Sequence, residues 1–287
     1  MPFYFFAWIG AITSGFIVIT AKLTSKHSIA NPWLFNFLLT AVTLLFTVPI
    51  ALFNNASFPS DWMPIIIAAI FSVLFNIFWI FSTYNLDVST LTPLFNIRAV
   101  FAVLIGIIFF SEKFTLYQLL IMLGILIAGV FSTMDEKFSV KSFFKPAIGI
   151  AVLTMLFLTL NNTFIKLSLV RNSLWTTNLW IAIINMILLA PTVGLFKKDL
   201  KMLNLSHILP IGAMGVFSTI TEFSANVAYG MNLSVTSIIM NTPFSMIFAF
   251  LFSIFAPKLL EKHTLKIYAI RFSAEILMIL GAMQLSR

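Results

Sequence analysis

The stretch 115–133, TLYQLLIMLGILIAGVFST, contains no charged side chain. Its centre, 119–130, is apolar throughout and shows no alternation of polar and apolar positions. A helix of about 20 residues crosses the hydrocarbon core of a bilayer, whereas a strand of a membrane barrel alternates over about 10 residues. The stretch therefore predicts a membrane-spanning helix.

Similar apolar stretches flank it along the whole chain. Of the 287 residues, 60% are hydrophobic and only 9% are charged, against about 25% charged in soluble domains. So few charges cannot cover a water-facing surface, so we expect an all-α integral membrane protein with ten transmembrane helices. The expected spans are 3–22, 32–53, 63–84, 89–110, 115–133, 146–169, 174–196, 207–230, 233–255 and 265–285.

The charge and the cysteine content exclude further classes of protein function. The net charge is +8, but the Lys residues lie mainly between apolar stretches, where they orient a membrane protein rather than bind nucleic acid. Cysteine is absent, which excludes disulfides and thiolate chemistry. The first residues lack the basic region of a signal peptide, so we expect the span 3–22 to be retained.

The two halves of the chain share short motifs in the same order. Trp33, Asn36 and Pro49 recur as Trp175, Asn178 and Pro191; KL at 22–23 recurs at 166–167; NLDVST at 85–90 recurs as NLSVTS at 232–237; and EKFT at 112–115 recurs as EKHT at 261–264. Two sequential copies of a five-helix unit must enter the membrane in opposite directions, which predicts a 5+5 inverted-topology repeat. The predicted units are 1–133 and 146–287, joined by a polar loop at 134–145.

These features resemble the drug/metabolite transporter superfamily, specifically its ten-helix EamA-type members. The resemblance covers nearly the whole chain and depends on the 5+5 arrangement, on Lys22 and Lys166 near the end of each first helix, and on the Glu-x-x-Thr turns at 112–115 and 261–264. Ser111 and Leu260 stand where the family has Gly. The resemblance implies ten helices around a central cavity and alternating access to it.

The implied function is secondary active transport, or exchange, of a small polar or charged metabolite such as an amino acid. Its partners would be the lipid bilayer, the small-molecule substrate, and protons or a counter-substrate, with no cofactor, metal or nucleic acid and no enzymatic activity. A broad-specificity exporter of drugs and other amphipaths is the alternative within this class. A structural or receptor-like membrane protein without a transport cycle is the alternative outside it.

Ionisable side chains inside spans are expensive to bury and are candidates for function. Arg98 and Glu222 lie in opposite halves, so they either form an interhelical salt bridge or bind substrate, Arg98 a carboxylate or phosphate and Glu222 an amine or proton. Arg271 and Glu275 are four residues apart on one helix and are expected to form a local charge pair. The equivalent positions in the other half are uncharged. Charges that are present in only one half suggest binding of an asymmetric substrate.

Uncharged polar and aromatic side chains complete the expected binding site. They are Asn76, Trp79, Asn161, Asn162, Asn226 and Tyr229. Buried Asn in membrane bundles also serves as a hydrogen-bonding contact between helices, and Tyr229 also suits the membrane interface. Lys22 and Lys166 are expected to extend toward the lipid headgroups.

Loop charge predicts orientation in the plasma (inner) membrane. Most loop Lys and Arg residues follow the odd-numbered spans, so the positive-inside rule places those loops in the cytoplasm and both termini outside. Many ten-helix relatives have their termini in the cytoplasm, which is the alternative.

Overall fold

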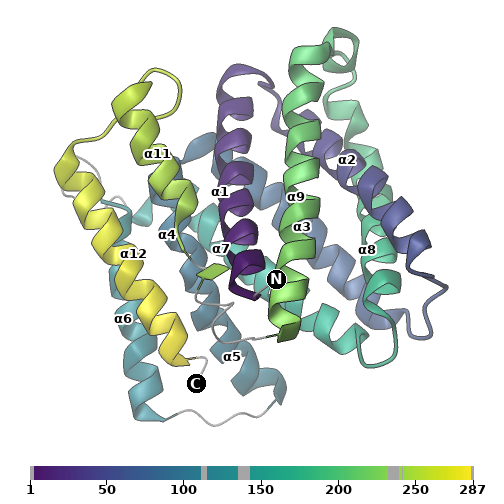
Figure 1. Cartoon of the computed structure of the whole chain (residues 1–287), viewed down its shortest axis with the longest axis horizontal. Helices are drawn as coiled ribbons and strands as arrows, with labels where there is room; N and C mark the ends of the chain where they lie inside the picture. The colour runs from purple at the N-terminus through teal and green to yellow at the C-terminus, as the bar shows by residue number, and fades with distance from the viewer. Residues whose placement is uncertain (1–2, 111–114, 135–142, 232–238, 241, 286–287) are drawn as a thin grey trace.

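The computed structural model describes residues 3–110, 115–134, 143–231, 239–240 and 242–285, and every described element is a helix (Figure 1). The α-helices are α1 (Phe3–His27), α2 (Pro32–Phe53), α3 (Met63–Asn85), α4 (Val88–Leu94), α5 (Arg98–Phe110), α6 (Leu116–Ser132), α7 (Pro146–Ser168), α8 (Leu174–Leu189), α9 (Leu205–Met231), α11 (Phe244–Phe255) and α12 (Leu265–Leu285). Short 3₁₀ segments are η1 (Phe95–Ile97), η3 (Ala190–Leu195) and η4 (Asp199–Met202).

A helix lies within each of the ten stretches expected to span the membrane. In the described residues, six helical segments are long and apolar enough to cross a bilayer: Tyr4–His27, Pro32–Phe53, Met63–Asn85, Val88–Ile108, Pro146–Ser168 and Leu174–Leu195. Leu116–Ser132, Leu205–Thr221 and Phe244–Phe255 are shorter apolar helices. The chain is thus a multi-pass membrane protein that is all-helical over its described residues, and the number of ten crossings stays a prediction.

Local sequence signals fix where several helices begin. Asn31 caps α2 by accepting hydrogen bonds from the amides of Trp33 and Leu34, and Pro32 occupies the first turn, where its missing N–H costs nothing. Thr115 and Gln118 form a capping box at the start of α6. These caps satisfy backbone donors that would otherwise be orphaned at a helix end.

Helices from the two halves of the chain lie beside one another (Figure 1). Long contacts join α3 to α7 and α1 to α9, and α6 packs along α12 at the opposite edge of the molecule from the α2–α8 pair. The core between them is aromatic in places: the ring of Phe71 on α3 stacks with those of Phe157 and Phe164 on α7. The two halves therefore share one packed bundle.

Large apolar side chains cover the outer faces of α6 and α12. Leu120 is 58% exposed and Leu277 is 62% exposed. Exposed apolar side chains that lie together mark a surface that contacts another apolar phase. These outer faces are suited to lipid.

The predicted span 89–110 is interrupted rather than continuous. α4 ends at Leu94, the 3₁₀ segment η1 follows, and α5 begins at Arg98. Pro93 lies at this interruption; it lacks the N–H for a helical hydrogen bond and crowds the preceding turn. A 3₁₀ segment in the middle of a helix is typical of a hinge.

Candidate functional site: a closed polar end and an interrupted helix

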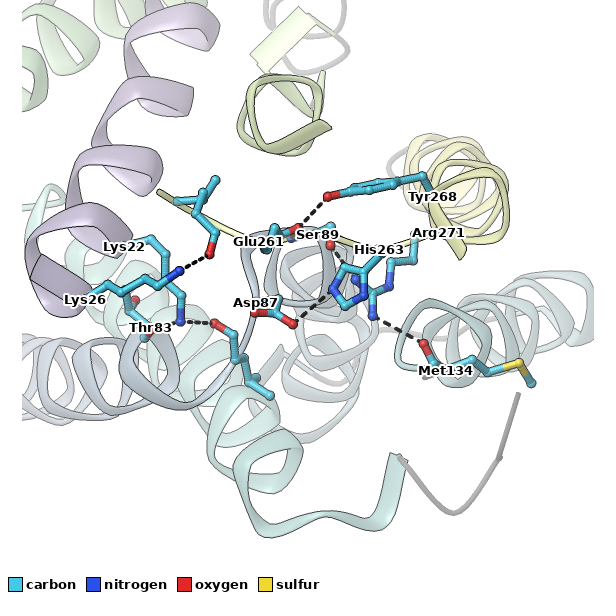
Figure 2. Close-up of polar contacts among 12 residues, drawn as sticks. Lys22, Lys26, Thr83, Asp87, Ser89, Met134, Glu261, His263, Tyr268 and Arg271 are labelled. Carbon is cyan, nitrogen blue, oxygen red and sulfur yellow. Dashed lines mark hydrogen bonds and ion pairs between the residues drawn. The ribbon is translucent and has the colours of Figure 1, made fainter. Parts of the chain in front are cut away.

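Polar side chains from both halves meet at one end of the bundle (Figure 2). They come from the end of α1, the α3–α4 loop with the first turn of α4, and the α11–α12 loop with the start of α12. We call these residues the closing network: Lys22, Lys26, Asp87, Ser89, Glu261, His263, Tyr268 and Arg271.

Lys22 lies inside this network rather than at the lipid headgroups. Its side chain is 8% exposed, and Nζ donates hydrogen bonds to the carbonyl oxygens of Thr83 at 2.8 Å and Leu86 at 2.7 Å. These carbonyls terminate α3, where the helix dipole favours a cation. The expectation that Lys22 extends to the headgroups was therefore wrong, whereas Lys166 is exposed.

The end of α1 also holds the loop that precedes α12. Lys26 Nζ donates to the carbonyl oxygen of Leu260 at 2.7 Å. His27 Nε2 lies 2.6 Å from the carbonyl oxygen of Leu259. The end of α1, in the first half of the chain, thus binds backbone carbonyl oxygens of a loop in the second half.

Asp87 and His263 form the exposed edge of the network. Asp87 Oδ2 lies 3.1 Å from His263 Nε2. The hydrogen bond from His263 is the main cause that lowers the pKa of Asp87 below its usual range; burial opposes it, and the charges of His263, Lys22 and Arg271 add to it. Asp87 therefore remains a carboxylate well into the acid range.

Glu261 lies deeper, where two donors share one of its oxygens. The backbone amide of Ser89 donates to Oε1 at 3.2 Å, and the hydroxyl of Tyr268 donates to the same oxygen at 3.3 Å. Glu261 is 5% exposed. It therefore fixes the first turn of α4 against the start of α12.

Arg271 joins the same turn to α6. Its Nη1 donates to Ser89 Oγ, and Nη2 donates to the carbonyl oxygen of Met134 at 3.3 Å. The side chain is 3% exposed. Because these contacts point to the closing network, the local pair of Arg271 with Glu275 stays a prediction.

Glu275 lies one turn further into the bundle, beside the interrupted helix. Its Oε1 accepts a hydrogen bond from Asn96 Nδ2 on η1 at 2.9 Å. The positive charge of Arg98, the first residue of α5, acts on this carboxyl group. The Arg98 side chain itself is exposed.

The remaining predicted binding residues divide between the core and the surface. Asn161 is buried and donates to the carbonyl oxygen of Ala68 at 2.9 Å, which joins α7 to α3. Trp79 packs in a core cluster with Ile80. Asn76 is half-buried and Asn162 is exposed.

Three predicted residues lie on α9, namely Glu222, Asn226 and Tyr229. The structure describes the α9 backbone through these positions, but their side chains lie outside its description. The predicted pairing of Arg98 with Glu222 therefore stays a prediction.

A small polar cavity lies between α2, α8 and α9. Its volume is about 40 Å³, and its polar lining includes Thr43, Thr47, Asn178, Ser218 and Thr219. Thr43 and Thr47 lie in the later half of α2 and Asn178 in the first turns of α8, on the side away from the closing network, while Ser218 and Thr219 lie on α9. The cavity is large enough for about one water molecule.

Sequence reasoning missed most of the closing network. It selected Arg271, but it treated Asp87 and Glu261 only as parts of the repeated motifs 85–90 and 261–264. The structure brings these two motifs together through the Ser89–Glu261 contact. The repeat did not signal this contact, because the copy of 85–90 at 232–237 has no acidic residue and Glu261 lies four residues before α12 begins.

Comparison with known proteins agrees with a transport role. Among the described residues, no group of three His, Cys, Asp or Glu side chains could hold a metal ion. No curated protein shows significant similarity to the chain. A family model, that of the EamA-like transporter family, matches residues 1–134. Over these residues the chain is similar to the EamA-like transporters, a family of the drug/metabolite transporter superfamily.

Proposed function

We propose that the protein is a secondary active transporter of a small polar or charged metabolite that works by alternating access in the plasma (inner) membrane. The family that residues 1–134 resemble consists of membrane transporters of the drug/metabolite type. The observation that carries the proposal is the closing network, in which residues of the first half bind residues of the second half at one end of the bundle. Such contacts must break for that end to open.

The arrangement of helices supports two inverted five-helix units, 1–133 and 146–287. In this arrangement α1, α2 and α3 of the first unit correspond to α7, α8 and α9 of the second. Under that correspondence the contact between α3 and α7 is equivalent to the contact between α9 and α1, and both contacts are extensive. The α2–α8 and α6–α12 contacts convert into themselves. A two-fold axis in the membrane plane produces such reciprocity.

Interrupted helices support a substrate site near the middle of the bundle. Thr92 Oγ1 on α4 and Ser245 Oγ on α11 are 2.8 Å apart, beside Pro93 and Pro243. In many secondary transporters, substrates bind where interrupted helices of the two repeats meet. The guanidinium of Arg98 suits the carboxylate or phosphate of a substrate.

Flux into liposomes containing the purified protein tests this proposal. The panel comprises amino acids, organophosphates, amines and a lipophilic cation, with empty liposomes as the control. We expect saturable uptake of an anionic or zwitterionic solute, reduced by Arg98→Ala and retained better by Arg98→Lys. Uptake of the lipophilic cation alone would favour a drug exporter, and no uptake of any solute by folded protein would overturn the transport proposal.

A further inference from the structure

Glu275 combines deep burial with incomplete hydrogen bonding. The side chain is 1% exposed and lies within α12, where its neighbours Ala274 and Met278 belong to an apolar cluster. Oε1 accepts the hydrogen bond from Asn96. No donor among the described residues reaches the buried Oε2. Glu261 Oε2 is likewise buried without a donor, but Glu261 Oε1 accepts two hydrogen bonds where Glu275 Oε1 accepts one.

None of the charged groups described around Glu275 is hydrogen-bonded to Oε2. Of the elements packed against α12, α5 brings Arg98, α6 brings only Tyr117 at its exposed first turn, and α4 and η1 carry no titratable side chain. On α12 itself, Arg271 lies one turn away and binds Ser89 and Met134. Lys266 and Tyr268 lie nearer the start of that helix.

A buried carboxylate is costly unless its oxygens are paired, and a bound proton removes the charge that causes this cost. The protonated Oε2 becomes a hydroxyl that can donate, while Oε1 continues to accept from Asn96. Because Asn96 lies on η1, Glu275 is hydrogen-bonded directly to the break between α4 and α5.

We propose that Glu275 is the proton-binding site that couples transport to a proton gradient, an inference that rests on the proposed transport function. On one side of the membrane, Glu275 Oε2 takes a proton from water and one O–H bond forms. On the other side, the same bond breaks and water receives the proton. In the charged state, Glu275 holds Asn96 and attracts Arg98; in the neutral state, it releases that attraction and Arg98 becomes available to an anionic substrate.

Infrared difference spectroscopy tests proton binding without knowledge of the substrate. Spectra of the full chain in liposomes are recorded across a pH titration in H₂O and D₂O. We expect a carbonyl stretching band of a buried carboxylic acid that shifts in D₂O, disappears in Glu275→Gln and persists in Glu261→Gln. Absence of the band from the wild type, or its persistence in Glu275→Gln, would overturn the proposal.

Two further variants guard against misfolding of Glu275→Gln. Glu275→Asp retains a titrating carboxyl and should keep a displaced band. Asn96→Ala removes the hydrogen bond to Oε1 and should change the pH midpoint of the wild-type band. An unchanged band and midpoint in both variants would assign the proton to another residue.

Transport measurements separate this proposal from the proposed function. With a solute that the panel identifies, an imposed pH gradient should drive accumulation by the wild type. Glu275→Gln should lose this accumulation but keep solute exchange. Accumulation that remains gradient-driven in Glu275→Gln contradicts the proton site alone, whereas absence of all flux contradicts the transport function and leaves the infrared result to decide the site.

Discussion

The Asp87 carboxylate joins the α3–α4 loop to the α11–α12 loop through His263. Its side chain is 42% exposed, so solvent screening limits the pair to about 0.2–1 kcal/mol. We expect Asp87→Asn to lower the free energy of unfolding by this amount at neutral pH.

The same contact has a defined pH dependence. Because the hydrogen bond from His263 lowers the pKa of Asp87, its stabilising contribution is complete above the ordinary Asp value of about 3.9. It is lost as the pH falls further, through the lowered value. The difference in unfolding midpoint between wild type and Asp87→Asn should therefore shrink on acidification, and a difference that grows would contradict this assignment.

Asn161 tests whether a polar residue in a span serves structure or binding. Its amide donates to the carbonyl oxygen of Ala68 on a neighbouring helix, and such bonds in membrane bundles average about 0.6 kcal/mol. We expect Asn161→Ala to lower thermal stability in detergent by a comparable amount and to leave the Michaelis constant for transport unchanged. A raised Michaelis constant with unchanged stability would place Asn161 in the substrate site.

Single residues were the hardest part to predict from sequence. Because charge inside a membrane is costly, the sequence identified Arg271 and Glu275 as candidate functional residues. It could not identify their partners, because Ser89, Asn96 and Met134 are distant in sequence and only the packing of α12 against α4 and α6 brings them near. The prediction for Lys22 was wrong for the same reason, because the carbonyl oxygens at the end of α3 that bind it belong to another helix.

At the scale of elements, close approach of α1 and α11 depends on a residue without a side chain. A Cβ placed on Gly15 would lie 2.7 Å from Phe244 Cβ and 3.1 Å from its carbonyl carbon. These atoms cannot rotate away, and overpacking of this kind costs about 1–3 kcal/mol.

We therefore expect Gly15→Ala to lower the midpoint of thermal unfolding. Gly149→Ala on α7 is the matched control, because a Cβ there meets no atom within 4 Å and Ala favours a helix. Equal effects of the two substitutions would show that packing between α1 and α11 does not limit stability.

Helix positions followed from apolar length, whereas their interruptions did not. Near Pro93 and Pro191, the structure replaces the α-helix by 3₁₀ turns at 95–97 and 190–195. Hydropathy averages over a whole span, so it does not register a local change in hydrogen-bond pattern. Asn96 owes its position toward Glu275 to this change.

At the scale of the whole molecule, the loops gather at two ends. Asn31 Nδ2 donates to Asp199 Oδ2 at 2.7 Å, at the end that holds the closing network. Asn172 Oδ1 accepts from the amide of Ser60 at 2.8 Å at the other end. The positive-inside rule predicts that the network end faces the cytoplasm.

Cysteine labelling in intact cells tests this orientation, because the natural chain contains no Cys. Ser60 and Met202 are exposed at opposite ends. We expect Ser60→Cys to react with a membrane-impermeant maleimide, and Met202→Cys to react only after permeabilisation. The reverse pattern would place both termini in the cytoplasm.

Alternating access is the central claim, and solute counterflow tests it most directly. Liposomes containing the protein are loaded with a high concentration of an unlabelled transported solute and diluted into a trace of the labelled solute. A carrier that exposes its site to one side at a time predicts transient accumulation of label above equilibrium. Entry of label that rises to equilibrium without this overshoot would show a continuous pore and contradict the account.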